Sequence, residues 1–580
     1  MILPATRQEM EGRGWSGLDI LLVSGDAYVD HPSFGVPLLG RVLEREGFRV
    51  GIVAQPRFKN ETEVLEDLRR MGAPRLFTGI GAGAVDSMLN NYTASKKPRS
   101  DDMYSPGGRS GMRPDYATVV YTKFVKRAFV DVPVVVGGVE ASLRRLAHYD
   151  FWLGRVRPSV LVESGADALV FGMAERQIVA LAKALRDAAV PGREALQEAL
   201  RQERGVAWLS DDKRVEPPFK YLRLPSFEEV RDDKRKFLRS TMLVEAETNP
   251  YNAKALVQRH GSRMVVINPP VLPMSEQELD AIHELPFTRR PHPSYKEKIT
   301  AHEMIKYSVT VNRGCFGGCS FCSLALHQGR IVQSRSERSV LEEIKGLARL
   351  DGFNGIVSDV GGPTANMYAL GCGDEQARAA CRRPSCLYPK PCPRLITSQR
   401  RLTALLKKAR ALPGIRKVLV ASGVRFDLAL LDPEFLEELV RHHVGGHLKV
   451  APEHADDRVL ALMRKPGFAL FEKFLSEFER ISKDAGKAQF VVPYFISAFP
   501  GSTPEAMRRV REWLGRKNWR LQQVQLFIPT PMTRATALFW SGIDPESGRP
   551  LFTAREKKDR EEQRLILQPH RARAKRSGGR

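Results

Sequence analysis

Short apolar runs alternate with amphipathic stretches over the first 190 residues of the chain. Five runs predict strands, at residues 18–25, 49–54, 75–80, 132–138 and 166–172. Between them, stretches such as 36–46 and 175–185 repeat apolar residues at helical spacing. Short buried strands that are joined by helices form parallel sheets covered on both faces. Residues 1–190 therefore predict an α/β domain with a Rossmann-like parallel sheet.

A second alternation of the same kind begins at residue 307. Six runs predict strands, at residues 307–311, 354–359, 417–421, 447–450, 490–497 and 522–527. Helical stretches such as 336–350 and 504–514 separate these runs. Six strand–helix units in a row fit a partial (β/α)6 barrel of the TIM type over residues 298–545. In such a barrel the loops after the strand ends carry the chemistry.

The remaining segments have weaker patterns. Residues 191–297 are polar and in places helical, and they predict a connecting region or a cap of the first domain. Residues 90–114 form a long loop, which is typical of either a functional loop or a disordered excursion. Residues 546–580 form a C-terminal extension. Its last part, 571–580, holds five basic and no acidic side chains, so we expect this tail to be disordered.

The composition is that of an ordinary globular protein. Of 580 residues, 42% are hydrophobic and 27% are charged, which excludes bulk disorder and fibrous repeats. The chain is long enough for two or three domains of about 100 to 200 residues each. No apolar run reaches the roughly 20 residues that a membrane span needs, and the start does not resemble a signal peptide. The sequence therefore predicts a cytoplasmic protein without a membrane partner.

The chain carries a strong positive charge. Its formal net charge is +24 and its sequence pI is about 9.8. Such an excess favours polyanionic partners, so nucleic acid is a possible partner. The alternative is a generally basic, solvated surface that binds nothing in particular.

All seven cysteines lie between residues 315 and 392, in two sets. They are Cys315, Cys319 and Cys322, followed by Cys372, Cys381, Cys386 and Cys392. Thiols stay reduced in the cytoplasm, so this clustering indicates metal or redox chemistry rather than disulfides.

The first set follows the predicted strand at 307–311 directly. It reads Arg-Gly-Cys-Phe-Gly-Gly-Cys-Ser-Phe-Cys over residues 313–322, a Cys-x3-Cys-x2-Cys triad in a loop rich in glycine. Three thiolates can hold three irons of a 4Fe-4S cube and leave the fourth iron open for a ligand that is not protein. The alternatives are a structural zinc site and buried thiols without a metal.

The triad resembles the one that defines the radical S-adenosylmethionine (SAM) superfamily. The spacing agrees, Phe321 precedes the third cysteine, and the loop follows the first strand of a six-unit barrel. The resemblance implies that the open iron binds the amino and carboxylate groups of SAM. It also implies that an electron from the reduced cluster breaks the sulfonium, which gives a 5'-deoxyadenosyl radical and methionine.

The same resemblance implies further SAM-binding residues after the next strands. Gly361 and Gly362 lie where the superfamily has a Gly-Gly turn for the SAM amino group, and a side chain there would block the approach. Ser422, Arg425 and Glu453 lie where it has polar groups near the SAM carboxylate and ribose. The alternatives are an ordinary tight turn and loop side chains that face solvent.

One branch of the superfamily is more similar still. Residues 142–150, 359–368 and 451–454 resemble segments of the YgiQ-type radical SAM proteins, and the similarity spans roughly residues 18–550. That family has no settled reaction. The resemblance therefore implies the cofactor but not the substrate.

The second cysteine set has enough ligands for a site of its own. Cys372, Cys381, Cys386 and Cys392 lie in a segment that several prolines stiffen. Four thiols can close a second iron–sulfur cluster or a tetrahedral zinc site. The spacing contains no Cys-x2-Cys pair and does not identify the metal, and reduced thiols without a metal are the remaining alternative.

The first domain, placed before such a barrel, resembles the cobalamin-binding-like layer of many superfamily members. Cobalamin proteins with a histidine ligand carry the pattern Asp-x-His-x-x-Gly, whereas the chain has Asp-His-Pro-Ser-Phe-Gly at residues 30–35. Because His31 does not fit this pattern, the sequence disfavours bound cobalamin. It favours a fold retained for packing or for substrate docking.

These patterns predict a radical SAM iron–sulfur enzyme that abstracts hydrogen from an unknown substrate. Such an enzyme needs an external one-electron reductant of the flavodoxin or ferredoxin type. Two alternatives stay open. The basic charge favours an RNA-modifying radical SAM enzyme, and a triad without a working SAM pocket would make the chain a non-catalytic iron–sulfur binding or sensor protein. The sequence identifies no catalytic side chain.

Deletion of the chain after Pro569 is expected to leave the melting temperature and the metal content unchanged. The last ten residues hold no apolar side chain larger than alanine, so burial cannot offset the entropy of ordering them. Any affinity for nucleic acid should fall, together with its dependence on salt. Thermal melting and a salt titration with RNA test this, and a large loss of stability would contradict it.

Overall fold

The computed structural model describes residues 2–568; Met1 and residues 569–580, which include the predicted basic tail, lie outside the described residues. The described chain forms two compact units. Unit 1 comprises the residues up to 274 together with 278–306 and 326–328. Unit 2 comprises residues 275–277, 307–325 and the chain from 329 onward.

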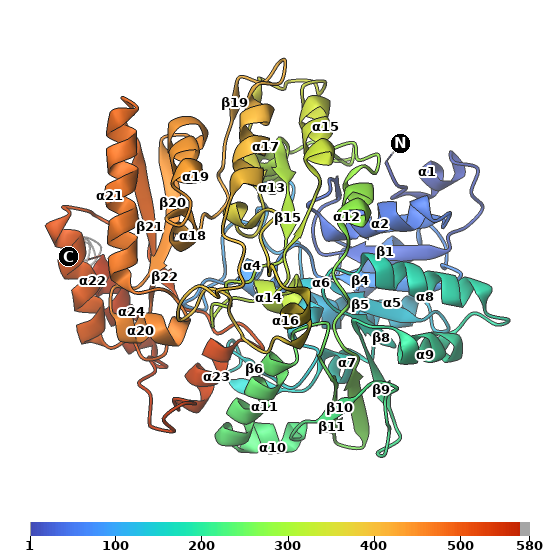
Figure 1. The fold of residues 1–580 in the computed structure, drawn as a ribbon. Helices are drawn as coiled ribbons and strands as arrows, with labels where there is room; N and C mark the ends of the chain where they lie inside the picture. Colours follow the sequence, from blue (N-terminus) through green and yellow to red (C-terminus); the bar gives the residue numbers. More distant parts are fainter. Residues whose placement is uncertain (1, 569–580) are drawn as a thin grey trace, which may run out of the picture. The chain divides into compact units, whose positions relative to one another are not determined.

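Unit 1 is built on a sheet of nine strands, counted over the described residues (Figure 1). Five strands are parallel and lie side by side: β3 (Val50–Ala54), β1 (Ile20–Ser24), β4 (Phe77–Gly81), β5 (Val134–Gly137) and β8 (Ala168–Val170). The sheet continues through β9 (Val206–Ser210), β12 (Arg263–Ile267), β11 (Ala255–His260) and β10 (Tyr221–Arg223). The predicted Rossmann-like parallel sheet is therefore present.

The last four strands come from the segment that the sequence predicts as a connecting region or cap. Residues 191–297 supply β9, β10, β11 and β12, and β9 pairs antiparallel with β8 at the end of the parallel part. Residues 191–297 join the sheet rather than form a cap because β11 and β12 pair as an antiparallel hairpin, which a turn at Gly261 closes. β11 reads Ala-Leu-Val-Gln-Arg-His, so half of it is polar, and its apolar run is too short to predict a strand by itself.

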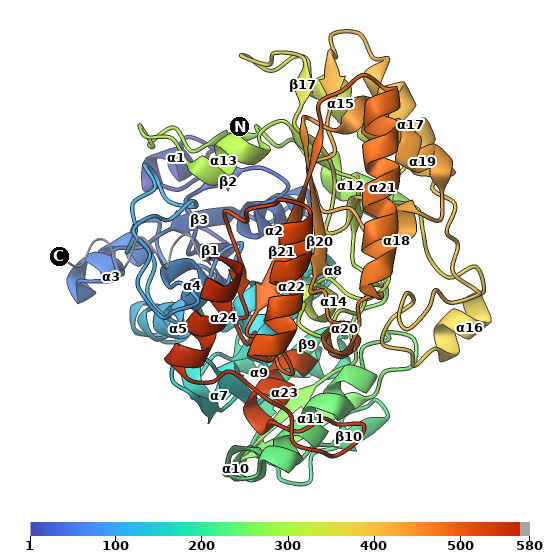
Figure 2. The same cartoon turned by 90° about the vertical axis from the view of Figure 1, so that its left-hand side faces the viewer.

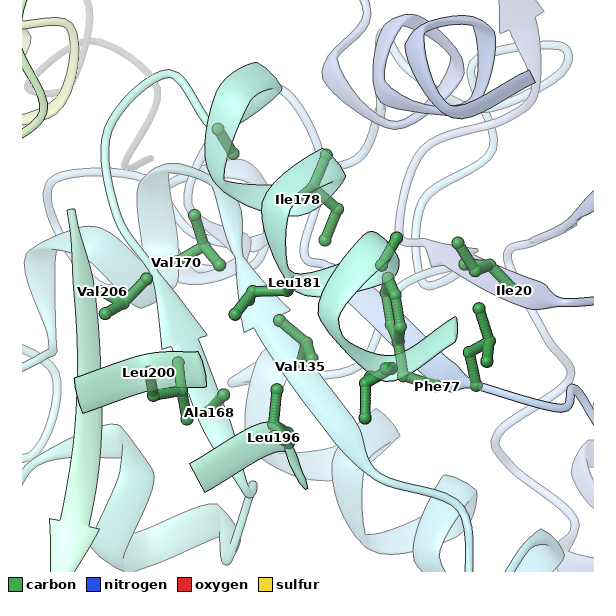
Figure 3. Packing of buried hydrophobic residues seen from close by; sticks show 14 of the residues in the cluster. Ile20, Phe77, Val135, Ala168, Val170, Ile178, Leu181, Leu196, Leu200 and Val206 are labelled. Atoms are coloured by element: carbon green, nitrogen blue, oxygen red, sulfur yellow. The ribbon is translucent and has the colours of Figure 1, made fainter. Parts of the chain in front are cut away.

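Helices cover both faces of the parallel part, as a buried parallel sheet requires. On one face α2 (Gly35–Arg45), α8 (Glu175–Asp187) and α9 (Arg193–Gln202) contact one another in turn. On the other face α3 (Glu61–Arg69), α5 (Ala117–Ala128) and α7 (Val160–Ser164) do the same. Figure 3 shows how Leu181 of α8 and Leu196 of α9 point at Val135 and Ala168 on the strands.

Unit 2 repeats strand and helix in the predicted order. Its strands are β14 (Ser308–Thr310), β17 (Ile356–Val357), β18 (Asp359–Gly361), β19 (Lys417–Val418), β20 (His447–Glu453), β21 (Phe490–Ser497) and β22 (Gln525–Leu526). The pairs β14–β18, β17–β19, β20–β21 and β21–β22 are all parallel. The fold class predicted from the sequence, α/β with a parallel sheet and a partial barrel, is confirmed.

Helices that follow the strands of unit 2 pack along the outside of the strands. They include α15 (Glu337–Leu347), α17 (Arg400–Arg410), α19 (Pro433–Glu438), α21 (Phe468–Asp484) and α22 (Pro504–Arg516). Figures 1 and 2 both show α15, α17, α19 and α21 side by side along the strands. The long helix α21 buries Phe471, Phe474 and Phe478, which repeat at helical spacing. Over residues 2–568, none of the helices has the length and apolar character to cross a membrane.

We expect the substitution Leu181→Ala to destabilise unit 1 by about 2–5 kcal/mol, because the side chain is fully buried between α8 and the sheet and a cavity would remain. Leu153→Ala is the matched control, since Leu153 is 49% exposed and its loss should stay within about 0.5 kcal/mol. Urea unfolding followed by circular dichroism compares the two. Equal losses would contradict the assigned core.

Candidate functional site

The cysteine triad lies in a tight loop after β14 and the short strand β15 (Asn312–Arg313). Two glycines make the loop possible. Gly314 has a φ of 81° and Gly318 a φ of 65°, values that side chains rarely allow. A Cβ on Gly318 would also overlap the backbone carbonyl of Pro384, and one on Gly314 would overlap that of Ile331. The loop is therefore held by close backbone contacts on two sides.

The three thiols lie close enough to affect one another's ionisation. Burial first, and then the neighbouring Cys319 and Cys315, raise the pKa of Cys322 to about 12. The pKa of Cys315 is raised in the same direction, by burial first and Cys319 second. Free thiols here would stay protonated, whereas a bound metal would hold its coordinating thiol as the thiolate. Without a metal, the set is therefore poorly suited to act as a nucleophile.

Across residues 2–568, no group of three or more His, Cys, Asp or Glu side chains is positioned to hold a metal ion. The three cysteines of a 4Fe-4S site bind three different irons, so they are not expected to surround a single ion. Whether the triad suits such a cluster is therefore judged from the groups around its sulfurs, beginning with hydrogen-bond donors. The Gly317 N–H points at Cys315 Sγ at 3.4 Å, and Thr364 Oγ1 lies 3.8 Å from the same sulfur. Donors of this kind stabilise negative sulfur.

Arg425, which the resemblance assigns to SAM, faces the triad. Its Nη1 lies 3.4 Å from Cys319 Sγ, and its Nε donates to Asp427 Oδ1 at 2.9 Å. The side chain is buried, and Asp427 and the two thiols Cys319 and Cys315 raise its pKa despite that burial. The guanidinium is therefore a permanent positive charge next to the sulfurs, where it offsets the charge of a cluster with three thiolates.

The predicted Gly-Gly turn lies at the carboxyl end of β18. A Cβ on Gly361 would come within 2.5 Å of Ser422 Oγ, and one on Gly362 would come within 2.6 Å of the Asn312 carbonyl oxygen. Ser422 is fixed in turn by Asp359, whose carboxylate accepts hydrogen bonds from the Ser422 hydroxyl and N–H. The structure thus brings the predicted Gly361, Gly362 and Ser422 together.

Asn312 is a candidate that the sequence reasoning missed. It is fully buried, its Oδ1 accepts no hydrogen bond, and its Nδ2 makes only a long contact of 3.5 Å to the Thr364 carbonyl. A buried acceptor without a partner costs free energy unless a ligand satisfies it. Asn312 lies beside Gly362, where a ligand amino group would supply the missing donor. The sequence feature that could have identified Asn312 is its position between the first strand of the barrel and the triad.

Glu453, at the end of β20, is the last of the predicted site residues. Its φ is 71°, which is strained for a residue with a side chain, and the pairing of β20 with β21 shifts register between Val450 and Glu453. Burial raises the pKa of Glu453, while Lys465 at 3.8 Å and Arg425 lower it. The carboxylate also acts on Cys322. The predicted Glu453 is therefore near the triad, in a bulge that aims it inward.

Unit 1 has a candidate ligand site of its own. The order β3, β1, β4 makes the carboxyl ends of β1 and β4 the point where open α/β sheets bind ligands. There the buried Arg113 pairs with Asp26 at 2.7 Å and donates to the Ala82 carbonyl. Beside this pair lies a cavity of about 550 Å³, lined by Lys59 and by residues of the loop 90–114 among others. The predicted long loop thus borders a pocket.

Curated relatives resemble almost the whole chain. The UPF0313 protein of Geobacter sulfurreducens is 49% identical over 568 residues, covering 98% of this chain and 92% of the relative. The UPF0313 protein of Bradyrhizobium diazoefficiens is 48% identical over 569 residues, covering 94% and 83%. Identity at this level over the full length makes them members of one family.

A solved structure resembles the fold at low identity. It is that of TsrM from Kitasatospora setae, a radical S-adenosylmethionine methyltransferase with cobalamin and a [4Fe-4S] cluster bound. The TM-score is 0.52 at 15% identity, and the alignment covers 95% of this chain and 91% of TsrM. Both units are therefore found together in one enzyme fold.

This likeness overturns the expectation about cobalamin. The sequence disfavours bound cobalamin because His31 does not fit the Asp-x-His-x-x-Gly pattern, and that prediction was wrong: TsrM has cobalamin bound on a chain of the same fold. The pattern tests only for a histidine ligand to cobalt, so its absence says nothing of other modes of binding. His31 itself is buried and accepts a hydrogen bond from the Ser33 N–H at Nδ1.

Family profiles account for most of the chain. Residues 2–308 match "Radical SAM N-terminal" and residues 309–514 match "Radical SAM superfamily". The second match begins six residues before the triad and includes the Gly-Gly turn, Ser422, Arg425 and Glu453. The chain therefore belongs to the radical SAM superfamily, within the UPF0313 proteins, and is an enzyme whose reaction is unknown.

Proposed function

We propose that unit 2 binds a 4Fe-4S cluster through Cys315, Cys319 and Cys322 and cleaves SAM reductively to abstract hydrogen from a substrate. The bound cluster would supply the electron that breaks the sulfonium to a 5'-deoxyadenosyl radical and methionine. The observation that carries the proposal is the unpaired, buried Oδ1 of Asn312 beside a Gly-Gly turn and the triad. It offers an acceptor where the SAM amino group is expected.

The surrounding residues have separable roles in this proposal. Gly361 and Gly362 let the chain pass close to Ser422 and Asn312, where a side chain would clash, and Asn312 Oδ1 accepts from the SAM amino group. Arg425 stays positive next to the sulfurs and balances their charge. Glu453, held in its strained bulge, faces the same space and is placed to accept from a hydroxyl or ammonium of SAM.

The reaction also needs partners that come from outside the chain. We propose that a flavodoxin or ferredoxin type protein delivers the electron in the cytoplasm, where both the thiols and such carriers remain reduced. The substrate class is open. Positive charge over the chain supports RNA as one candidate, and salt-dependent RNA binding without base specificity would not be enough to establish it.

Methyl transfer with cobalamin in unit 1 is the second candidate function. The support is the likeness to TsrM, a methyltransferase, and the cavity at the ligand edge of the unit 1 sheet. The lining residues would bind and orient such a cofactor. Lys59 is suited to an anionic group on it, whereas Arg113 is already paired with Asp26 and Asp102. The lining also has acidic side chains that are suited to donors on the cofactor, namely Asp101, Asp102 and Asp115. Equilibrium dialysis of the purified protein with hydroxocobalamin tests this binding without any assay of activity.

Reduced protein is expected to convert SAM to 5'-deoxyadenosine and methionine. The protein, reconstituted anaerobically with iron and sulfide, is reduced with dithionite, and the nucleosides are separated by liquid chromatography. Cys322→Ala should abolish the product, since it removes one of three cluster ligands. S-adenosylhomocysteine as a product would support the methyl-transfer candidate instead. A full and reducible cluster that leaves SAM intact, with and without fractionated cell extract, would refute the proposal.

Gly362→Ala is expected to weaken SAM binding at least tenfold and to leave the iron content unchanged. The new Cβ would lie 2.6 Å from the Asn312 carbonyl oxygen and 2.8 Å from Asn312 Oδ1, so the proposed acceptor for the SAM amino group would have to shift. Gly371→Ala is the matched control, because its Cβ would meet no atom within 4 Å. Isothermal titration with SAM and iron analysis compare the two variants. Equal affinities would place SAM elsewhere.

A further inference from the structure

The four cysteines that the SAM site does not use are drawn together by the fold of their segment. Cys372 forms a β-bridge with Leu395, and the Leu395 N–H donates to the Cys392 carbonyl at 2.9 Å. The Cys392 N–H donates to the Cys386 carbonyl at 2.8 Å. Cys381 lies between Cys372 and Cys386 in the chain, at the end of the short helix α16 (Glu375–Ala380). Backbone contacts within the segment therefore connect Cys372, Cys386 and Cys392, and Cys381 belongs to the same short segment.

A positive charge accompanies this set, as it does the triad. Arg330 Nη2 lies 3.8 Å from Cys381 Sγ, as Arg425 Nη1 lies 3.4 Å from Cys319 Sγ in the triad. A guanidinium in this position would offset the negative charge of metal-bound thiolates. Four cysteines with a nearby cation have the donor chemistry of an iron–sulfur or zinc site.

The set is packed directly against the triad loop. The Cys386 N–H donates to the Phe316 carbonyl at 3.0 Å, and Ser385 Oγ donates to the Gly317 carbonyl at 2.7 Å. Cys315, Cys386 and Cys392 pack against one hydrophobic cluster that includes Phe316. Both cysteine sets therefore border the same small core, with only the residues of this loop between them.

The other side of the set is open to partners. All four cysteines are partly exposed. The segment 374–394 carries five basic and only two acidic side chains, so its net charge is positive. A surface of this charge attracts an acidic protein and speeds its docking.

We propose that Cys372, Cys381, Cys386 and Cys392 hold a second iron–sulfur cluster, which passes electrons from a protein reductant to the SAM-binding cluster. The relay role rests on the proposed SAM cleavage; the cluster itself does not. One electron leaves the reductant, reduces the second cluster and moves on to the first. There it is consumed when the S–C5' bond of SAM breaks into a 5'-deoxyadenosyl radical and methionine, so no proton is required.

Metal content tests the cluster. The variant C372S/C381S/C386S/C392S is expected to lose about two to four irons per chain after anaerobic reconstitution, and the triad variant C315A/C319A/C322A to keep them. The triad variant should also show the electron paramagnetic resonance signal of a reduced cluster, a readout that does not depend on whether the fourfold variant folds. Zinc in place of iron, or no metal in the triad variant, would overturn the proposal.

Reductant choice tests the relay. Dithionite is small and can reduce the SAM-binding cluster directly, whereas flavodoxin is proposed to deliver electrons through the second cluster. In C386S/C392S the rate of SAM cleavage with reduced flavodoxin, divided by the rate with dithionite, should therefore fall at least tenfold relative to the unmodified protein. An equal effect on both rates, or none on either, would overturn the relay. If the unmodified protein cleaves no SAM while the triad variant still holds iron, the proposed function fails and the second cluster stands.

Discussion

The candidate site depends on backbone contacts that leave no room for a side chain. Gly314 meets Ile331, Gly318 meets Pro384 and Gly362 meets Asn312, in each case at distances that a Cβ would violate. These contacts draw the triad loop, the cysteine-rich segment and the end of β18 onto one another. Glycine loses more entropy on folding than other residues, so the contacts cost stability. What they provide is a fixed position of the triad loop against the cysteine-rich segment and the end of β18.

The second constraint is electrostatic, because the site contains several buried ionisable side chains. Arg425 is paired with Asp427 and faces Cys319, and Lys465 approaches Glu453 while its ammonium donates to the Ala451 carbonyl. Buried charges of one sign alone would be costly, whereas these alternate in sign. A cluster with three thiolates adds negative charge. The permanently protonated guanidinium next to the sulfurs is suited to it, and a lysine, which loses its proton more readily when buried, would be less so.

The sequence predicts the barrel strands and the parallel part of the unit 1 sheet well, and the remaining strands of that sheet poorly. The six strand positions of the barrel and the parallel part of the unit 1 sheet follow from apolar runs of ordinary length. The strands β9 and β12 are mostly apolar runs of five residues, and the sequence prediction missed them. The strands β10 and β11 do not follow from such runs, because they are short or half polar and gain stability from pairing with neighbours rather than from their own pattern. Asn312 and the bulge at Glu453 are invisible for a related reason: unpaired atoms and backbone strain exist only once the chain is folded.

Both units have polar groups at the carboxyl ends of their parallel strands. In unit 1, burial of these groups costs free energy of folding. Asp26 and Arg113 are almost completely buried there, and burial raises the pKa of Asp26 even though Arg113 opposes it. Apolar side chains of similar size would stabilise the fold as well or better. Arg113 instead connects three loops, because it pairs with Asp26 after β1, donates to the Ala82 carbonyl after β4 and approaches Asp102 in the loop 90–114. The buried charges therefore fix the loops that border the cavity.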